Sequence, residues 1–166
     1  MSEGILKKYY IIILLLISFL LNGYSSPQER FPEHDISIGP SVAYVNSENQ
    51  HGLSSNFDIG YTYYLFTTSI NFKQMKIENK NLYGAQAEFT IWAFLNFGGG
   101  YGYLYDQKYE WVSHFFIGLP VGGDIFKIGP FKSQYIEPYY RVNFYKNKKY
   151  HEFGILFKMT TFDFQL

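Results

Sequence analysis

The segment Phe97–Tyr105, which reads Phe-Gly-Gly-Gly-Tyr-Gly-Tyr-Leu-Tyr, constrains the fold of this chain more than any other feature. Side chains of a β-strand alternate between two faces, so one face here carries four aromatic rings and the other carries glycines and one leucine. The segment Tyr83–Leu95 repeats the pattern, with apolar side chains facing one way and glycine, glutamine, glutamate and threonine the other. An apolar outside and a small or polar inside are typical of a membrane β-barrel.

Length and composition agree with a small barrel. A chain of 166 residues is expected to form one domain. Aromatic residues make up 22% of it, and so many rings need either a large apolar surface to cover or a membrane to face. The net charge is zero, which gives no indication of a nucleic-acid partner, and the absence of cysteine excludes disulfides, thiolate metal sites and a cysteine nucleophile.

The N-terminus is typical of a secretory signal peptide. Lys7 and Lys8 precede the apolar run Tyr9–Leu21, and Gly23-Tyr24-Ser25 is a small-x-small cleavage signal. The run is shorter than the roughly 20 residues of a transmembrane helix, although an uncleaved anchor is an alternative. We therefore predict cleavage near Ser25 and three parts of the chain: a signal peptide (1–25), a periplasmic tether (26–34) and an outer-membrane barrel (35–166).

Eight stretches of the mature chain show the alternating pattern. They are Asp35–Val45, Asn56–Phe66, Ser69–Ile77, Tyr83–Leu95, Phe97–Tyr105, Tyr109–Val121, Gln134–Tyr145 and Tyr150–Thr161. Eight membrane strands of about 9–11 residues fit this length, and an even number returns the chain to the side where it began. Between them, Asn46–Ser55 is predicted to be a polar loop and the best candidate for a ligand or partner contact, Thr67-Thr68 a tight turn, and Thr160-Thr161 a β-bulge.

The inward faces carry charged side chains, which an eight-stranded barrel is just wide enough to enclose. We predict a lumen network of Asp58, Glu88, Glu110, His114, Glu137, Arg141, Glu152 and Lys158. Buried charges are tolerated when they are paired, and a guanidinium can bind two carboxylates at once. Arg141 is therefore the expected hub, and Glu137, two inward positions away, is an expected partner.

The outward faces carry aromatic rings, which favour the membrane interface when they have a polar tip. We predict an aromatic girdle near the outer rim, made of Tyr44, Phe57, Tyr83, Tyr103, Tyr105, Tyr109, Trp111 and Phe144.

The last predicted strand carries the pattern Glu152-x-Gly154-x-x-Phe157-x-Met159, which is similar to the signal that barrel-assembly machinery reads. With its eight strands, the chain from Asp35 onward resembles the small outer-membrane barrels of diderm bacteria, such as the OmpA transmembrane domain and OmpX. The resemblance implies an all-β, antiparallel, up-and-down transmembrane barrel in the outer membrane. Its implied partners are outer-membrane lipid and the assembly machinery.

The function expected from these features is a structural or surface-interaction role for a barrel with a filled or very narrow lumen. The alternatives are a narrow channel, a soluble lipocalin-like carrier with the aromatic face inside, and a lipid-modifying enzyme. We expect no enzymatic activity, cofactor or metal, because His114 lacks a serine two residues later on its strand face and the other histidines are scattered. Nothing in the sequence identifies a surface ligand.

Overall fold

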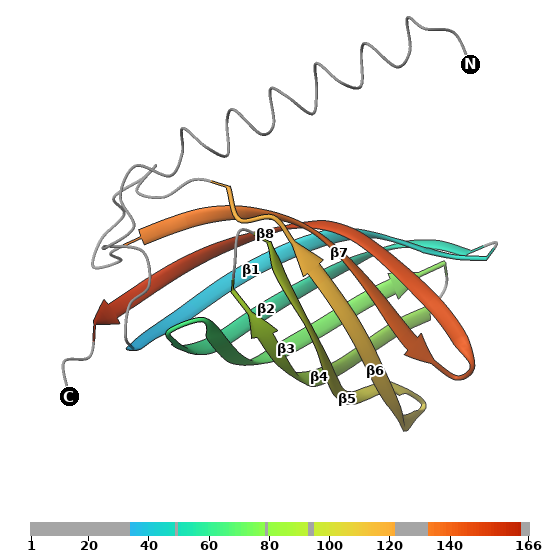
Figure 1. Cartoon of the computed structure of the whole chain (residues 1–166). Helices are drawn as coiled ribbons and strands as arrows, with labels where there is room; N and C mark the ends of the chain where they lie inside the picture. The colour runs from blue at the N-terminus through green and yellow to red at the C-terminus, as the bar shows by residue number, and fades with distance from the viewer. Residues whose placement is uncertain (1–33, 49, 79, 93–94, 122–132, 164–166) are drawn as a thin grey trace, which may run out of the picture. The chain divides into compact units, whose positions relative to one another are not determined.

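The computed structural model describes residues 34–48, 50–78, 80–92, 95–121 and 133–163, without the side chains of 133 and 161–163. These residues form a closed barrel of eight antiparallel strands, each paired with its neighbour in sequence, with β1 also paired to β8 (Figure 1). The strands are β1 (His34–Ser47), β2 (Gln50–Tyr63), β3 (Phe66–Ile77), β4 (Lys80–Ile91), β5 (Asn96–Asp106), β6 (Lys108–Gly118), β7 (Ser133–Tyr145) and β8 (Lys148–Asp163). The predicted eight-stranded antiparallel barrel is confirmed, whereas the predicted signal peptide lies outside the described residues.

The alternation of side chains decides which face of each strand lies inside. In β3 every second residue from Thr67 to Ile77 is buried, and every residue between them is exposed. Aromatic and aliphatic side chains occupy most of the exposed positions around the barrel, and Phe89 and Tyr101 remain 47% and 55% exposed. This arrangement is the reverse of a soluble barrel, in which such side chains would line the interior. No helix in the described ranges is long and apolar enough to cross a membrane.

The first two hairpins differ from the sequence prediction. The predicted loop Asn46–Ser55 is instead the end of β1 and the start of β2, joined at Glu48, whose φ is 48°. Ser54 is buried inside the barrel, so its polarity marks a lumen-facing strand and not a loop. The next turn lies at Tyr64, whose φ is 50°, and not at Thr67-Thr68. Thr67 faces the lumen, where its hydroxyl group forms a hydrogen bond with the hydroxyl group of Thr62.

The two ends of the barrel are different. We call the end where β1 begins and β8 ends the terminal end. The opposite end, with the turns β1–β2, β3–β4, β5–β6 and β7–β8, is the distal end.

Near the terminal end the pairing of β8 with β1 shifts, since Ser37 faces Thr160 but Asp35 faces Asp163. One extra residue of β8 therefore lies opposite β1, as the predicted bulge near Thr160-Thr161 requires.

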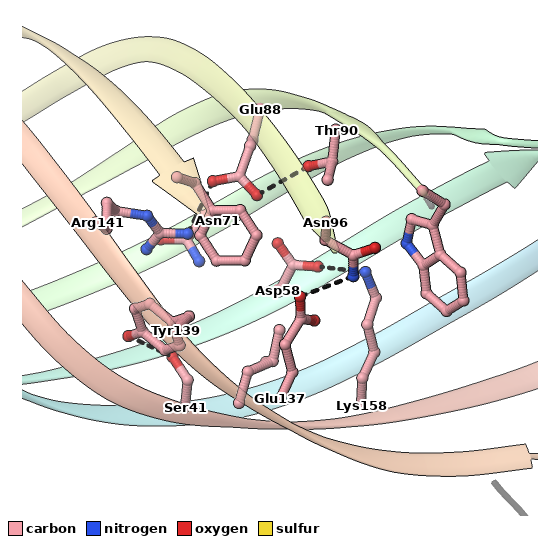
Figure 2. Close-up of a pocket in the computed structure, with 13 residues that line it drawn as sticks. Ser41, Asp58, Asn71, Glu88, Thr90, Asn96, Glu137, Tyr139, Arg141 and Lys158 are labelled. Atoms are coloured by element: carbon pink, nitrogen blue, oxygen red, sulfur yellow. Dashed lines mark hydrogen bonds and ion pairs between the residues drawn. The ribbon is translucent and has the colours of Figure 1, made fainter. Parts of the chain in front are cut away.

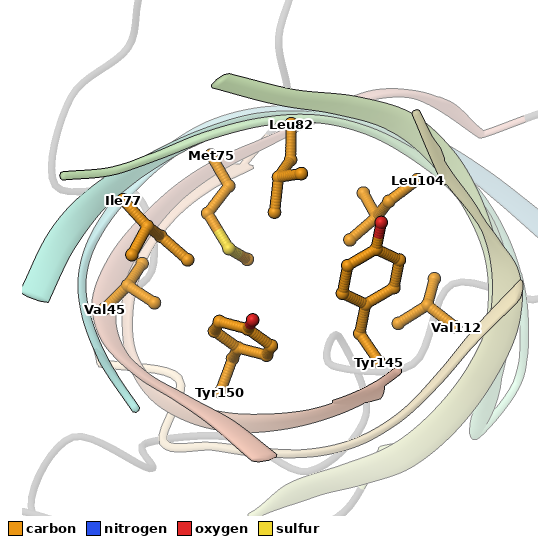
Figure 3. Close-up of a cluster of buried hydrophobic side chains, with 8 residues drawn as sticks. All are labelled: Val45, Met75, Ile77, Leu82, Leu104, Val112, Tyr145 and Tyr150. Carbon is orange, nitrogen blue, oxygen red and sulfur yellow. The ribbon is translucent and has the colours of Figure 1, made fainter. Parts of the chain in front are cut away.

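The distal part of the lumen is filled by apolar side chains and tyrosines. We call this set the distal ring; its members point toward the barrel axis from seven strands (Figure 3). They are Val45, Met75, Ile77, Leu82, Leu104, Val112, Tyr145 and Tyr150. Leu104 was predicted on the inward face beside the glycines of Phe97–Tyr105, whereas the other seven members of the ring were not predicted from the sequence.

Candidate functional site

The middle of the lumen holds a group of buried ionisable side chains, which we call the charged layer. Its members come from five different strands: Lys73 from β3, Glu88 from β4, His114 from β6, Arg141 from β7 and Glu152 from β8. Each occupies an inward position of its strand, so the closed barrel brings together residues that are far apart in sequence.

Arg141 lies at the centre of the charged layer. Its Nη2 donates a hydrogen bond to Oε2 of Glu88 at 2.8 Å, and its Nη1 lies 3.8 Å from Oε2 of Glu152. The guanidinium also packs over the rings of Phe116 and Tyr139, with 5.3 Å from its carbon to each ring centroid. The two carboxylates and the two π faces stabilise a cation that is shielded from water.

Both carboxylates have further partners. Glu88 Oε2 lies 2.7 Å from Nε2 of His114, and Glu152 Oε1 forms an ion pair with the ammonium group of Lys73. Asn143 donates a hydrogen bond from Nδ2 to the same Glu152 oxygen at 2.8 Å and accepts one from Lys73 at 3.1 Å. The charged layer is therefore a continuous network across the lumen.

On the terminal side of the charged layer the lumen contains further polar contacts (Figure 2). Asn96 donates a hydrogen bond to Oε1 of Glu137 at 2.7 Å, and Lys158 lies 3.9 Å from Oδ1 of Asp58. The cavity between these residues and Arg141 has a free volume of about 10 Å³. That is about enough for one water molecule, so the lumen is filled at this level.

Two glycines make room for this packing. A Cβ atom on Gly100 would collide with the ring of His114, and one on Gly118 would collide with the carboxylate of Glu137. Gly100 on β5 therefore lets the wall of the barrel approach the imidazole of His114.

The predicted lumen residues occupy different levels of the barrel. Seven are buried inside it: Asp58, Glu88, His114, Glu137, Arg141, Glu152 and Lys158. Glu110 instead lies at the distal rim, where its Oε1 is 3.0 Å from Nζ of Lys108 and 4.0 Å from Nζ of Lys146.

The pairing of Arg141 with Glu137 is wrong, because Arg141 turns toward Glu88 and Glu152 while Glu137 turns toward Asn96. Lys73 was not among the lumen residues predicted from the sequence. Lys73 lies two residues from Asn71 and two residues from Met75, on the inward face of β3. This spacing is the sequence feature that could have identified it as a lumen residue.

The predicted girdle residues all face outward and are exposed, at positions Tyr44, Phe57, Tyr83, Tyr103, Tyr105, Tyr109, Trp111 and Phe144. Most lie within a few residues of a distal turn, but Phe57 lies in the middle of β2, which corrects its predicted place at the rim. That error follows from the loop that was predicted where β2 begins. Of the assembly-signal residues, Glu152 faces the lumen beside Gly154, and Phe157 and Met159 lie on the outward face of β8.

Within the part of the chain that the structure describes, the lumen does not present the arrangement of a hydrolase. The imidazole of His114 contacts Glu88, and Ser113 lies on the opposite face of β6. A nucleophilic serine would have to lie within hydrogen-bond distance of the base. Among the residues that the structure describes, no group of three or more His, Cys, Asp or Glu side chains could hold a metal ion.

Comparison with known proteins agrees with this architecture. No family model and no curated protein sequence matches the chain. The fold is similar to the crystal structure of Neisserial surface protein A (NspA), with a TM-score of 0.55 and 13% sequence identity. The alignment covers 76% of this chain and 96% of NspA. The chain therefore has the fold of a small eight-stranded barrel of this kind.

Proposed function

We propose that this protein is an integral outer-membrane barrel with a closed lumen, acting as a structural or surface-interacting component of the envelope and not as an enzyme. One observation carries the proposal: apolar and aromatic side chains cover the outside while ion pairs fill the middle of the lumen. In hydrocarbon every backbone polar group needs a partner, and a closed barrel satisfies this requirement without a free edge.

The arrangement of the two faces argues against the lipocalin-like carrier. A soluble carrier would turn its bulky aromatic side chains toward an internal cavity and its charged side chains toward water. Here Tyr101, Trp111 and Phe153 are exposed, whereas Arg141 and Glu152 are buried.

The filled lumen argues against steady conduction. The distal ring closes the distal part, and the charged layer with its small cavity closes the middle. An ion would have to displace paired side chains from several strands in order to pass.

The proposal is tested by membrane fractionation and by recordings in planar bilayers. We expect the protein in the outer-membrane fraction, migrating faster on a gel when unheated than when boiled, because a closed barrel stays folded in mild detergent. We also expect little steady conductance. Recovery in the soluble periplasmic fraction would contradict membrane insertion, and a large stable conductance would support the narrow-channel alternative.

A further inference from the structure

The outer surface of the barrel carries a groove of about 530 Å³ in its distal half, over β8, β1, β2 and β3. Its apolar lining comes from Val42, Tyr44, Leu53, Phe153 and Ile155. A volume of this size is within the range of sites that hold small organic ligands.

The groove follows from the register of the four strands. Val42 pairs with Ser55 on one side and with Ile155 on the other, and these small or branched side chains form one level of the surface. The next level toward the distal end contains larger side chains, with Tyr44 paired to Leu53 and to Phe153. The change in side-chain size hollows the surface between two neighbouring levels.

Three polar side chains line up at the distal edge of the groove. Asn46 on β1 pairs with His51 on β2 and with His151 on β8, so the three lie side by side across three strands. Each lies one outward position beyond the Tyr44 level.

Both imidazoles are held by a tyrosine hydroxyl. Nδ1 of His51 lies 2.6 Å from the hydroxyl of Tyr44, and Nδ1 of His151 lies 2.7 Å from the hydroxyl of Tyr140. Each pair of rings is also stacked, with interplanar angles of 18° and 20°. A hydroxyl that donates to Nδ1 leaves the proton on Nε2, on the opposite side of the ring, where it can be donated to an oxygen ligand.

Positive charge flanks this row. Lys76 lines the groove from β3, next to Leu53. Lys149 lies on β8 two residues from His151, with its ammonium group 6.0 Å from the ring centroid of Phe144 on β7. The nearby carboxylate of Glu78 accepts a hydrogen bond from Gln50 at 3.4 Å, which ties it to the turn. The edge therefore offers the ammonium group of Lys76 and two imidazoles to an anion.

We infer that this groove binds one anionic lipid, with an acyl chain against the apolar lining and its phosphate at the row His51–Asn46–His151 beside Lys76. The inference rests on the proposed function, because it requires this face to meet lipid. Lysine is costly on a lipid-facing strand unless it lies near the interface or meets a polar group. A lipid phosphate at this depth supplies that group.

The test is native mass spectrometry of the whole protein in a non-ionic detergent. The probe is dioleoylphosphatidylglycerol, and dioleoylglycerol, which has the same chains without phosphate, is the comparison lipid. We expect one phosphatidylglycerol bound at low micromolar lipid, and at least tenfold weaker binding of dioleoylglycerol. We expect the double variant His51→Gln/Lys76→Gln to bind phosphatidylglycerol at least tenfold more weakly than the wild type.

The matched control is Lys80→Gln/Lys108→Gln, which removes two distal lysines that do not line the groove and should leave lipid binding unchanged. Equal loss in both double variants, or equal binding of the two lipids, would overturn the inference. The unheated gel shift of each variant is measured in parallel. A barrel that inserts into membranes but binds no discrete lipid contradicts this inference alone, whereas a protein that does not insert contradicts the proposed function.

Discussion

The distal ring and the charged layer are neighbouring levels of one lumen, and they are filled in different ways. On β3 the inward residue Met75 belongs to the ring, and Lys73, the next inward residue, belongs to the charged layer. On β8 the same step separates Tyr150 from Glu152. The backbone geometry is the same at the two levels, so the difference lies in the side chains.

The comparison shows two ways to exclude water from a narrow barrel. In the distal ring each side chain needs only neighbours of suitable volume, so the loss of one leaves a local cavity. In the charged layer each ion needs a partner of opposite charge. The loss of Arg141 therefore removes a cationic partner from both Glu88 and Glu152. We therefore expect damage to stay local in the ring and to spread in the charged layer.

The largest effect is expected for Arg141→Ala. Removing one partner from a buried ion network typically costs about 3–5 kcal/mol, because the remaining charges stay buried. The measurement is urea unfolding in detergent micelles, followed by tryptophan fluorescence. Arg141→Lys is the control, since it keeps the charge but loses the planar fork, and it should fall between the wild type and Arg141→Ala. A loss below 1 kcal/mol for Arg141→Ala would show that water enters the lumen freely.

In the distal ring we expect Leu104→Ala to cost about 2–5 kcal/mol, through lost burial and a residual cavity. Leu104→Met keeps most of the volume and should cost less than about 1.5 kcal/mol. The same unfolding assay measures both. If the two variants are equally unstable, packing volume does not explain how this level is closed.

A double-mutant cycle compares the energetic coupling of Arg141 to Glu88 with its coupling to Glu137. Glu88→Gln should offset part of the loss caused by Arg141→Ala, with a coupling of about 0.5–3 kcal/mol, because the two side chains are directly paired. Glu137→Gln should show much weaker coupling to Arg141→Ala, since Glu137 is bonded to Asn96. Stronger coupling to Glu137 than to Glu88 would contradict the observed network.

The smallest effect is expected for Lys108→Gln at the distal rim. Lys108 and Glu110 are paired at 3.0 Å, but the Lys108 side chain is 74% exposed. Exposed pairs typically contribute about 0.2–1 kcal/mol, so the unfolding midpoint should hardly change. A large loss of stability in this variant would mean that the difference in burial does not explain why this pair contributes less than the pairs of the charged layer.

The sequence predicted the fold and the inward or outward direction of most side chains, because both follow from an alternation with period two. It did not predict which charges meet. Glu137 and Arg141 are close on one strand, but the partners of Arg141 come from β4 and β8, and the pairing register and curvature of the closed barrel decide their positions.

Two further errors have physical causes. Ser54 was assigned to a loop because a polar lumen face has the composition of a solvent-exposed turn. Lys73 was overlooked because Gln74 and Lys76 make the outward face of β3 polar as well, and the alternation is weak there.

The charged layer also bears on the order in which the barrel forms. Lys73 and Glu152 are 79 positions apart in the chain, and Arg141 and Glu88 are 53 positions apart. Contacts between such distant residues form only after the entropy of closing a long loop has been overcome. Until β8 is in place, Lys73 and Arg141 lack a carboxylate that is needed to neutralise them. The entry of the last strand therefore completes the hydrogen-bonded wall and the charge balance in one step, which favours cooperative closure over a stable half-built barrel.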